Sequence, residues 1–200
     1  MGRTDRISRH KDNMRKCILE ATLQLGKQYG WTAVSMRKIA DRIEYSTPVL
    51  YEYFNNKEHI LHEVSKKGFL VLCLKIKEAC ATENKPEKKL FAMSTAYWEF
   101  ALFEHELYTL MFGSGSKCYN FCKDMPEVLS MGSSVQTIIA ELIGSGEKSE
   151  LFIPQYCLML WSLLHGLVYI NLICEEIPKE INMGIVEQAI KSIKLSSNIR

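Results

Sequence analysis

The spacing of apolar residues along the chain predicts a succession of helices. Over residues 11–29, apolar or small side chains recur three and four positions apart, which places them on one helix face, and Gly30 ends this pattern. No segment of any length alternates apolar and polar residues, so we expect an all-α fold without a sheet. The first ten residues are polar and basic and are predicted to form a mobile arm. Further long helices are predicted near residues 57–81, 87–104, 105–112, 126–143, 154–176 and 183–195.

Two short helices are predicted between the first helix and the helix at 57–81. Ser35 is a good N-cap for the first of them, and a break follows at Glu44 and Tyr45. Ser46 caps the second, which has Pro48 in its first turn, where a missing N–H costs little. Two short helices joined by a tight turn after a supporting helix are the components of a helix-turn-helix unit.

The second short helix is the candidate DNA-reading element. Val49 or Leu50, together with Phe54, would hold one of its faces against the scaffold, and the opposite face would fit the major groove of DNA. Ser35, Arg37 and Lys57 sit near helix starts and are candidate phosphate contacts. Arg3, Arg6 and Arg9 in the N-terminal arm could reach the backbone or a minor groove. The residues expected to contact DNA are Ser35, Arg37, Ser46, Thr47, Pro48, Tyr51, Tyr53 and Lys57.

The distribution of charge agrees with a DNA-facing N-terminus. Residues 1–67 contain 13 of the 25 Lys and Arg residues and 8 of the 23 Asp and Glu residues, a net charge of +5. The remaining residues carry a net charge of −3. A basic head on a slightly acidic body favours contact between one end of the protein and a polyanion, although a solvated surface with chance asymmetry gives the same count.

The N-terminal sequence resembles the DNA-binding domain of the TetR (tetracycline-repressor) family. Residues 18–40 read ILEATLQLGKQYGWTAVSMRKIA and residues 50–58 read LYEYFNNKE, and together with Ser46 they carry the resemblance over about 40 residues. The resemblance implies a helix-turn-helix DNA-binding domain over residues 1–60. It further implies a helical ligand-binding and dimerisation domain over residues 61–200.

The chain departs from the family pattern at the turn. The family usually has Ala-Gly-Val-Ser where this chain has Ile43-Glu44-Tyr45-Ser46. A glycine at that position allows a positive φ, which costs a glutamate on the order of 1 kcal/mol. Either the turn adopts another conformation here or it tolerates modest strain.

The body of the protein is expected to dimerise and to bind a small molecule, as the resemblance implies. The predicted helices at 154–176 and 183–195 match the family's dimerisation helices in position. Residues 156–174 contain no charged side chain, and a bundle helix covered by the core and a partner explains this better than a membrane span. We therefore expect a soluble, cytoplasmic homodimer.

A candidate ligand pocket follows from aromatic residues in the body. Trp161 and His165-Gly166 resemble the Trp…His-Gly signature of one C-terminal subgroup of these regulators, although a core histidine is the commoner role. Aromatic and methionine side chains suit an apolar or aromatic effector, and they equally suit ordinary core packing. The predicted pocket residues are Trp98, Tyr108, Phe112, Trp161 and His165.

Other function classes find little support in the sequence. The seven cysteines are odd in number and scattered, which indicates reduced thiols, and Cys118 and Cys122 lack a second close pair for a metal site. No glycine-rich phosphate loop or nucleophile motif occurs, so we expect neither an enzyme nor a cofactor. The sequence predicts a ligand-responsive repressor that binds a near-palindromic operator as a homodimer. The alternative is a helical protein-interaction module that no longer binds DNA.

Overall fold

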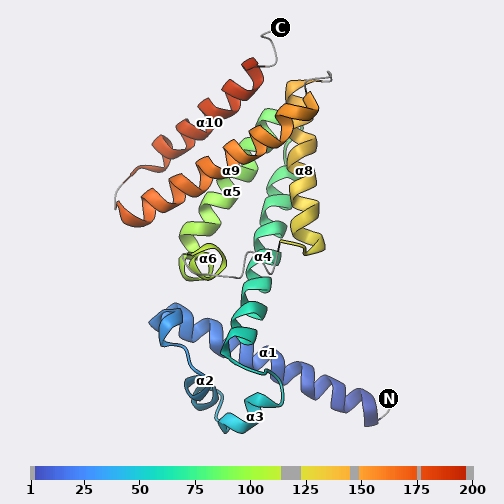
Figure 1. The fold of residues 1–200 in the computed structure, drawn as a ribbon, viewed down its shortest axis with the longest axis vertical. Coiled ribbons are helices and arrows are strands. Elements are labelled where there is room, and N and C mark those ends of the chain that lie inside the picture. The colour runs from blue at the N-terminus through green and yellow to red at the C-terminus, as the bar shows by residue number, and fades with distance from the viewer. Residues whose placement is uncertain (1–2, 114–122, 145–148, 175–176, 197–200) are drawn as a thin grey trace. The chain divides into compact units, whose positions relative to one another are not determined.

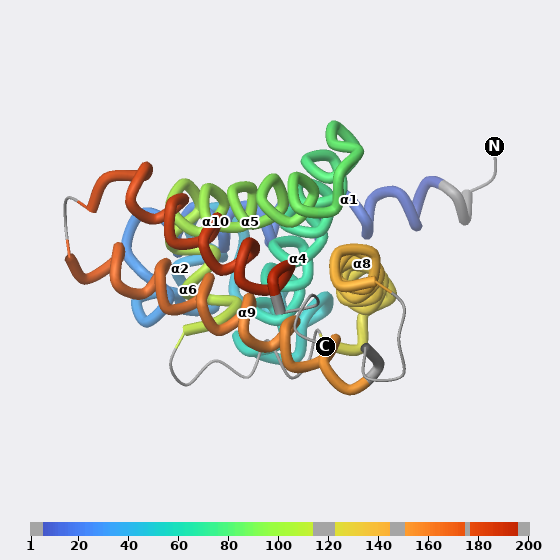
Figure 2. The backbone as a smooth tube through the Cα atoms, turned by 90° about the horizontal axis from the view of Figure 1, so that it is seen from above, coloured from blue at the N-terminus to red at the C-terminus, as the bar shows by residue number. Residues whose placement is uncertain are grey.

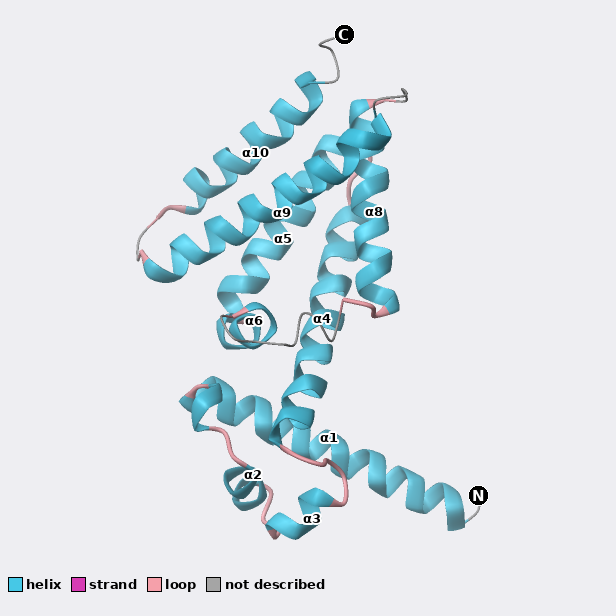
Figure 3. Cartoon of the chain, in the orientation of Figure 1, coloured by secondary structure: helices cyan, strands magenta, loops and turns pink. Residues whose placement is uncertain are grey.

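Every element in the described part of the chain is helical (Figure 3). The computed structural model describes residues 3–113, 123–144, 149–174 and 177–196. The expectation of an all-α fold is therefore confirmed. The elements are α1 (Arg3–Tyr29), the 3₁₀ helix η1 (Trp31–Ala33), α2 (Met36–Arg42), α3 (Thr47–Tyr51), α4 (Lys57–Ala81), α5 (Pro86–Phe103), α6 (His105–Phe112), α8 (Pro126–Ile143), α9 (Ser149–Ile173) and α10 (Lys179–Ser196).

The helices group into two compact units. Unit 1 contains residues 1–69 and α6, and unit 2 contains residues 70–104 and 123–200. From the sequence we placed the domain boundary at residue 60, so α6 was assigned to the body there. Helix α4 is continuous, and its first half belongs to unit 1 and its second half to unit 2.

Unit 1 is built on α1, against which η1 and α2 pack. Its core combines side chains from α1, α2, α3 and the start of α4, among them Ile18, Ile39, Leu50 and Ile60, which are fully buried. Gly30 ends α1 with a φ of 75°, and its N–H donates to the carbonyl of Gly26. The predicted C-terminal end of this helix is therefore confirmed.

The start of α1 differs from the prediction. The helix begins at Arg3, whereas residues 1–10 were predicted to be a mobile arm. Residues 3–10 contain neither glycine nor proline, so nothing in the sequence stops the helix from extending beyond its packed part. Adding a residue to an existing helix gains one hydrogen bond without a new nucleation cost. The side chains of residues 6–13 remain exposed, which is why the apolar pattern did not reveal the extension.

Unit 2 is a helical bundle in which α5, α8, α9 and α10 pack on one another. Figures 1 and 2 show α9 and α10 side by side. The two helices share a reciprocal amide pair, because the side chains of Asn171 and Asn182 donate to each other at 2.8 and 3.2 Å. Asn182 is buried, so this pair satisfies groups that would otherwise be unpaired away from water.

Helix α9 is the most apolar element. It begins at Ser149, five residues before the predicted start, and includes Pro154 in its second turn, where a proline removes one backbone hydrogen bond and its ring crowds the preceding turn. Within the described residues, Leu151–Ile173 is long and apolar enough to cross a membrane by length and composition, which is weak evidence on its own. Much of this helix is exposed in the single chain, including Leu158 and Tyr169.

Candidate nucleic-acid interface

Helix α2 and the turn after it are fixed by local hydrogen bonds. The Ser35 hydroxyl accepts from the backbone N–H of Lys38 at 3.3 Å, which confirms the predicted N-cap. After α2, the N–H of Tyr45 donates to the carbonyl of Ala40 at 3.0 Å. This bond closes the turn that separates α2 from α3.

Glu44 adopts the positive φ that a glycine would adopt. Its φ is 59°, and among the described residues other than glycine it is the one with a positive φ. Of the two alternatives left open by the sequence, the turn therefore keeps the positive φ and places the strain in Glu44.

Helix α3 turns one face inward and the other to solvent. Leu50 is fully buried and Phe54 is nearly so, which makes Leu50 rather than Val49 the inward anchor. Tyr51 is 54% exposed on the opposite side. Ser46, Pro48 and Glu52 are also exposed, and Thr47, Val49 and Tyr53 are half-buried. Ser46 occupies the N-cap position without a side-chain cap hydrogen bond. Tyr53 lies beyond the last residue of the helix.

Arg15 holds the C-terminal end of α3 and was not predicted. Its guanidinium donates to the carbonyl of Tyr53 at 2.7 Å and lies 4.3 Å from the centre of the Phe54 ring. The bond links positions 38 residues apart, so no local pattern in the sequence indicates it. Arg15 thus sets where the chain leaves the candidate reading helix.

The start of α4 carries the predicted phosphate contact Lys57. The side chain of Asn56 accepts from the N–H of His59 at 2.8 Å and caps the helix. The ammonium of Lys57 donates to the carbonyl of Trp31 at 3.0 Å. Lys57 is therefore held against η1 at the N-terminal end of α4, where backbone N–H groups also favour an anion.

The other predicted phosphate contact, Arg37, is strongly exposed. Its side chain is 88% exposed and lies 3.9 Å from the carboxylate of Asp41 one turn later. An exposed ion pair at this distance contributes little to stability. Arg37 is therefore accessible at the surface of α2, next to the Ser35 cap.

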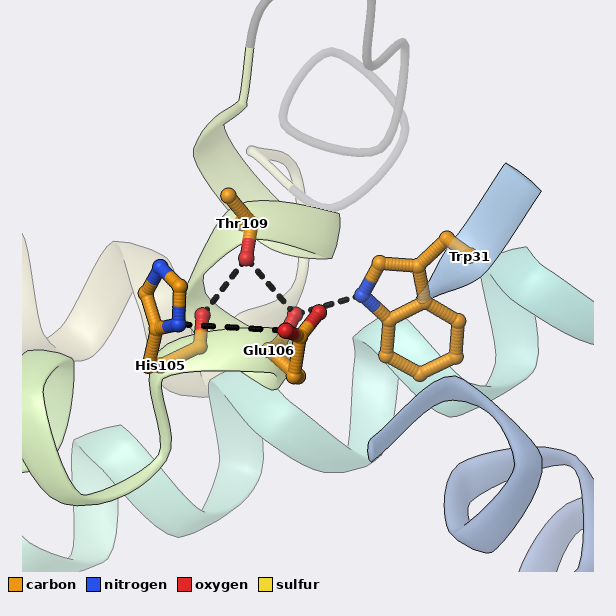
Figure 4. Close-up of polar contacts among 4 residues, drawn as sticks. All are labelled: Trp31, His105, Glu106 and Thr109. Atoms are coloured by element: carbon orange, nitrogen blue, oxygen red, sulfur yellow. Dashed lines mark hydrogen bonds and ion pairs between the residues drawn. The ribbon is translucent and has the colours of Figure 1, made fainter. Parts of the chain in front are cut away.

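Trp31 joins η1 to α6 within unit 1 (Figure 4). Its indole N–H donates to the backbone carbonyl of Glu106 at 2.5 Å. The Thr109 hydroxyl donates to the carbonyls of His105 and Glu106 at 2.6 and 3.1 Å. The Trp31 ring lies against Gly26, where an added Cβ would overlap it. Trp31 and its contacts were also not predicted.

The predicted pocket residues are divided between the two units. Trp161 and His165 contact each other in unit 2, and their ring centres are 4.5 Å apart. Tyr108 and Phe112 contact each other on α6 in unit 1. Trp98 is buried in α5, and its indole nitrogen has no hydrogen-bond partner in the described part of the chain. A ligand role for these five residues therefore stays a prediction.

His165 packs in a mainly apolar environment. The Tyr97 hydroxyl lies 3.2 Å from its Nε2 atom. Burial lowers the pKa of His165 from 6.5 to about 4, so the imidazole is neutral at pH 7.

A cavity of about 560 Å³ lies elsewhere in unit 2, between α4, α5 and α8. None of the five predicted pocket residues lines it. As for metals, no group of three or more His, Cys, Asp or Glu side chains in the described ranges could hold an ion. Cys118 and Cys122 lie outside the described residues.

Comparison with known proteins assigns the N-terminal part of the chain to a family. Residues 18–64 match the family of bacterial regulatory proteins named tetR. The chain is 41% identical over 69 residues to the HTH-type transcriptional repressor KstR of Rhodococcus jostii, covering 34% of this chain and 32% of that protein. It is 29% identical over 102 residues to the HTH-type transcriptional activator FasR of Mycolicibacterium smegmatis, covering 51% of this chain and 47% of that protein. The chain thus matches a third to a half of the length of these relatives.

The fold of the whole chain is also shared with solved structures. A transcriptional regulator from Rhodococcus sp. RHA1 superposes with a TM-score of 0.68 at 16% identity, covering 93% of this chain and 98% of that one. The relatives that match the N-terminal part of the chain are named as HTH-type transcriptional regulators. The helix-turn-helix geometry of α2 and α3 agrees with the match of residues 18–64 to the tetR family of bacterial regulatory proteins.

Proposed function

We propose that this chain is a ligand-responsive transcriptional repressor that binds a near-palindromic operator as a homodimer in the cytoplasm. The observation that carries the proposal is the division of α3 into a buried and an exposed face. Leu50 fixes the helix on unit 1, and Thr47, Pro48 and Tyr51 lie on the side available to a major groove. Repression is proposed because the KstR relative, which matches at 41% identity, is a repressor.

The exposed apolar surface of α9 and α10 supports dimerisation. Leu158 and Tyr169 on α9 are 64% and 66% exposed, and Ile185 and Leu195 on α10 are also exposed. Covering such side chains with the same helices of a second copy removes apolar surface from water. Four helices, two from each chain, would form the shared bundle.

Operator binding and effector response follow from the dimer. Two heads would enter successive major grooves about 34–36 Å apart on one face of DNA. An effector that favours a body conformation with a different head spacing would weaken operator binding, by a coupling of about 1–3 kcal/mol. Helix α4 contributes to both units and is the proposed connection between effector and DNA.

The proposal is tested by DNA binding of the full chain. Fragments of the source genome are enriched with the purified protein at moderate salt, and the best fragment is measured by fluorescence anisotropy over a range of salt concentrations. Affinity should fall with salt with a logarithmic slope of roughly −0.9 for each phosphate contact. If no fragment is enriched, the chain is not a DNA-binding regulator, and the alternative of a protein-interaction module is favoured.

A pair of tyrosine variants tests the proposed contact face. Tyr51→Ala should weaken binding to the enriched fragment at least tenfold. Tyr29→Ala removes a tyrosine of nearly the same exposure, 55% against 54%, from the end of α1 and should leave affinity within twofold of the unchanged protein. Equal affinities for the two variants would mean that α3 does not face DNA.

A further inference from the structure

The cavity between α4, α5 and α8 differs in chemistry from the aromatic pocket predicted from the sequence. Its volume of about 560 Å³ lies within the 300–1,000 Å³ that is typical of small-molecule sites. All of its lining residues belong to unit 2. The described part of the cavity therefore lies within unit 2.

The walls of the cavity are aliphatic and sulfur-containing. Among the described residues that line it none is aromatic, and Met93, Met131, Val135 and Ile138 supply apolar surface from α5 and α8. Methionine side chains are flexible and adapt to irregular or flexible ligands. The described walls offer a planar aromatic ligand no ring to stack on, whereas an alkyl chain requires only apolar contact.

Two thiols from α4 line the same cavity. Cys73 and Cys80 are seven positions apart, so they lie on one face of the helix. The Cys73 thiol donates to the sulfur of Met131 at 3.8 Å, and the Cys80 thiol donates to the carbonyl of Lys89 at 3.8 Å. Burial, with a smaller contribution from the Glu127 carboxylate, raises the pKa of Cys73 from 9.0 to about 11. Burial also raises the pKa of Cys80, so both thiols are neutral at pH 7.

The polar groups of the cavity do not favour a charged ligand. Lys77 and Glu127 both line it and carry opposite charges. Ser130 and Ser134 supply the hydroxyls among its described lining residues, and Ser134 donates its hydroxyl hydrogen to the carbonyl of Ser130 at 2.9 Å. Hydroxyl oxygens that keep lone pairs suit a neutral hydrogen-bonding group such as an alcohol.

We propose that this cavity binds an uncharged aliphatic molecule, an alkyl chain with a neutral polar end at Ser130 and Ser134, and that this is the effector class of the regulator. The chemical class of the ligand is inferred from the residues that line the cavity. That this ligand controls DNA binding rests on the proposed function.

Alkylation of the cysteines measures occupancy without reference to DNA. The full chain is treated with N-ethylmaleimide with and without 1-decanol, and peptide mass spectrometry follows each cysteine separately. Saturating 1-decanol should slow modification of Cys73 at least tenfold and leave the exposed Cys17 and Cys174 within twofold. At the same concentration, decanoate and 2-naphthol should slow the modification of Cys73 at least tenfold less than 1-decanol does.

Two neighbouring serines provide matched variants. Ser133 and Ser134 are both exposed on α8, and each donates its hydroxyl hydrogen to the carbonyl four residues earlier. Only Ser134 lines the cavity. Ser134→Trp should reduce the protection by 1-decanol at least tenfold, whereas Ser133→Trp should leave it unchanged. Circular dichroism verifies that both variants are folded.

The outcomes separate this proposal from the proposed function. If 1-decanol fails to protect Cys73, or if decanoate or 2-naphthol protects it equally well, the aliphatic site is wrong. If protection occurs and Ser134→Trp abolishes it, the site and its ligand class stand. Release of DNA by 1-decanol, measured by anisotropy, then supports the effector role, and its absence overturns that role while leaving the site intact.

Discussion

Replacing Glu44 by glycine should stabilise unit 1. The residue has a φ of 59°, a region that costs an L-amino acid about 1–2 kcal/mol relative to the right-handed helix. Glycine adopts this φ without that cost, although its greater freedom in the unfolded chain lowers stability by about 0.4–1 kcal/mol. The difference gives a net increase of about 0.5–1 kcal/mol in the free energy of unfolding. For a chain of 200 residues this corresponds to a rise of about 1–4 °C in Tm.

The measurement is urea unfolding of the full chain followed by far-ultraviolet circular dichroism. Glu52→Gly is the matched control, because Glu52 is also an exposed glutamate beside α3 but has a φ of −69°. That variant should lose about 0.5–1 kcal/mol, since glycine gains nothing in a right-handed conformation. Glu44→Ala keeps the strained backbone and removes the carboxylate, so its stability should stay near that of the unchanged protein.

The sign of the change in the free energy of unfolding caused by Glu44→Gly shows whether the backbone at this residue is strained. If Glu44→Gly lowers the free energy of unfolding as much as Glu52→Gly does, the turn carries no strain at Glu44. If Glu44→Ala stabilises the protein as much as Glu44→Gly does, the cause is the carboxylate and not the positive φ.

Three other changes have effects of predictable direction. The pKa of His165 is about 4 in the folded protein and 6.5 in the unfolded chain, so the unfolded state binds more protons as pH falls between these values and the free energy of unfolding should drop by on the order of 2–3 kcal/mol. Urea unfolding at several pH values should show a smaller drop for His165→Phe. An equal drop in the two proteins would mean that other groups cause it. Gly26→Ala should destabilise the protein by about 1–3 kcal/mol, because the added Cβ overlaps the Trp31 ring. The Cβ added by Gly132→Ala meets no atom within 4 Å, so this control should stabilise the protein by about 0.5–1 kcal/mol. Thermal melts compare the two variants, and equal changes in Tm would contradict the overlap at Gly26. Asn182→Ala removes both bonds that the Asn171 amide shares with Asn182, while the bond from Asn171 to the Leu167 carbonyl remains, and should cost about 1–3 kcal/mol in chemical denaturation. A loss below about 0.5 kcal/mol would show that water replaces the pair.

The sequence was sufficient where the structure depends on neighbouring residues. The cap at Ser35 and the end of α1 at Gly30 were predicted, because each uses a hydrogen bond or backbone angle set within a few positions. The inward anchor Leu50 was one of two candidates, because a helix of five residues is too short for a repeating apolar spacing to show which residue faces inward.

The sequence was insufficient where the structure depends on distant segments. The bond from Arg15 to the carbonyl of Tyr53 joins two helices, and nothing local distinguishes Arg15 from the other basic residues of α1. The cavity likewise combines Cys73 and Ser134 from separate helices. Aromatic density suggested a pocket from composition, but the phase of each helix decides which of its side chains border a common space.

The contact between Lys57 and the Trp31 carbonyl bears on the thermodynamics of DNA association. A long, mobile side chain that becomes immobilised at an interface typically costs about 0.5–1.5 kcal/mol in lost rotamer entropy. Here the ammonium is already positioned by a 3.0 Å hydrogen bond within the folded head. An ammonium has three donors, so one bond to a carbonyl is compatible with another to a phosphate oxygen. If the head binds DNA as proposed, this lysine loses its freedom when the protein folds, and association is correspondingly less opposed by entropy.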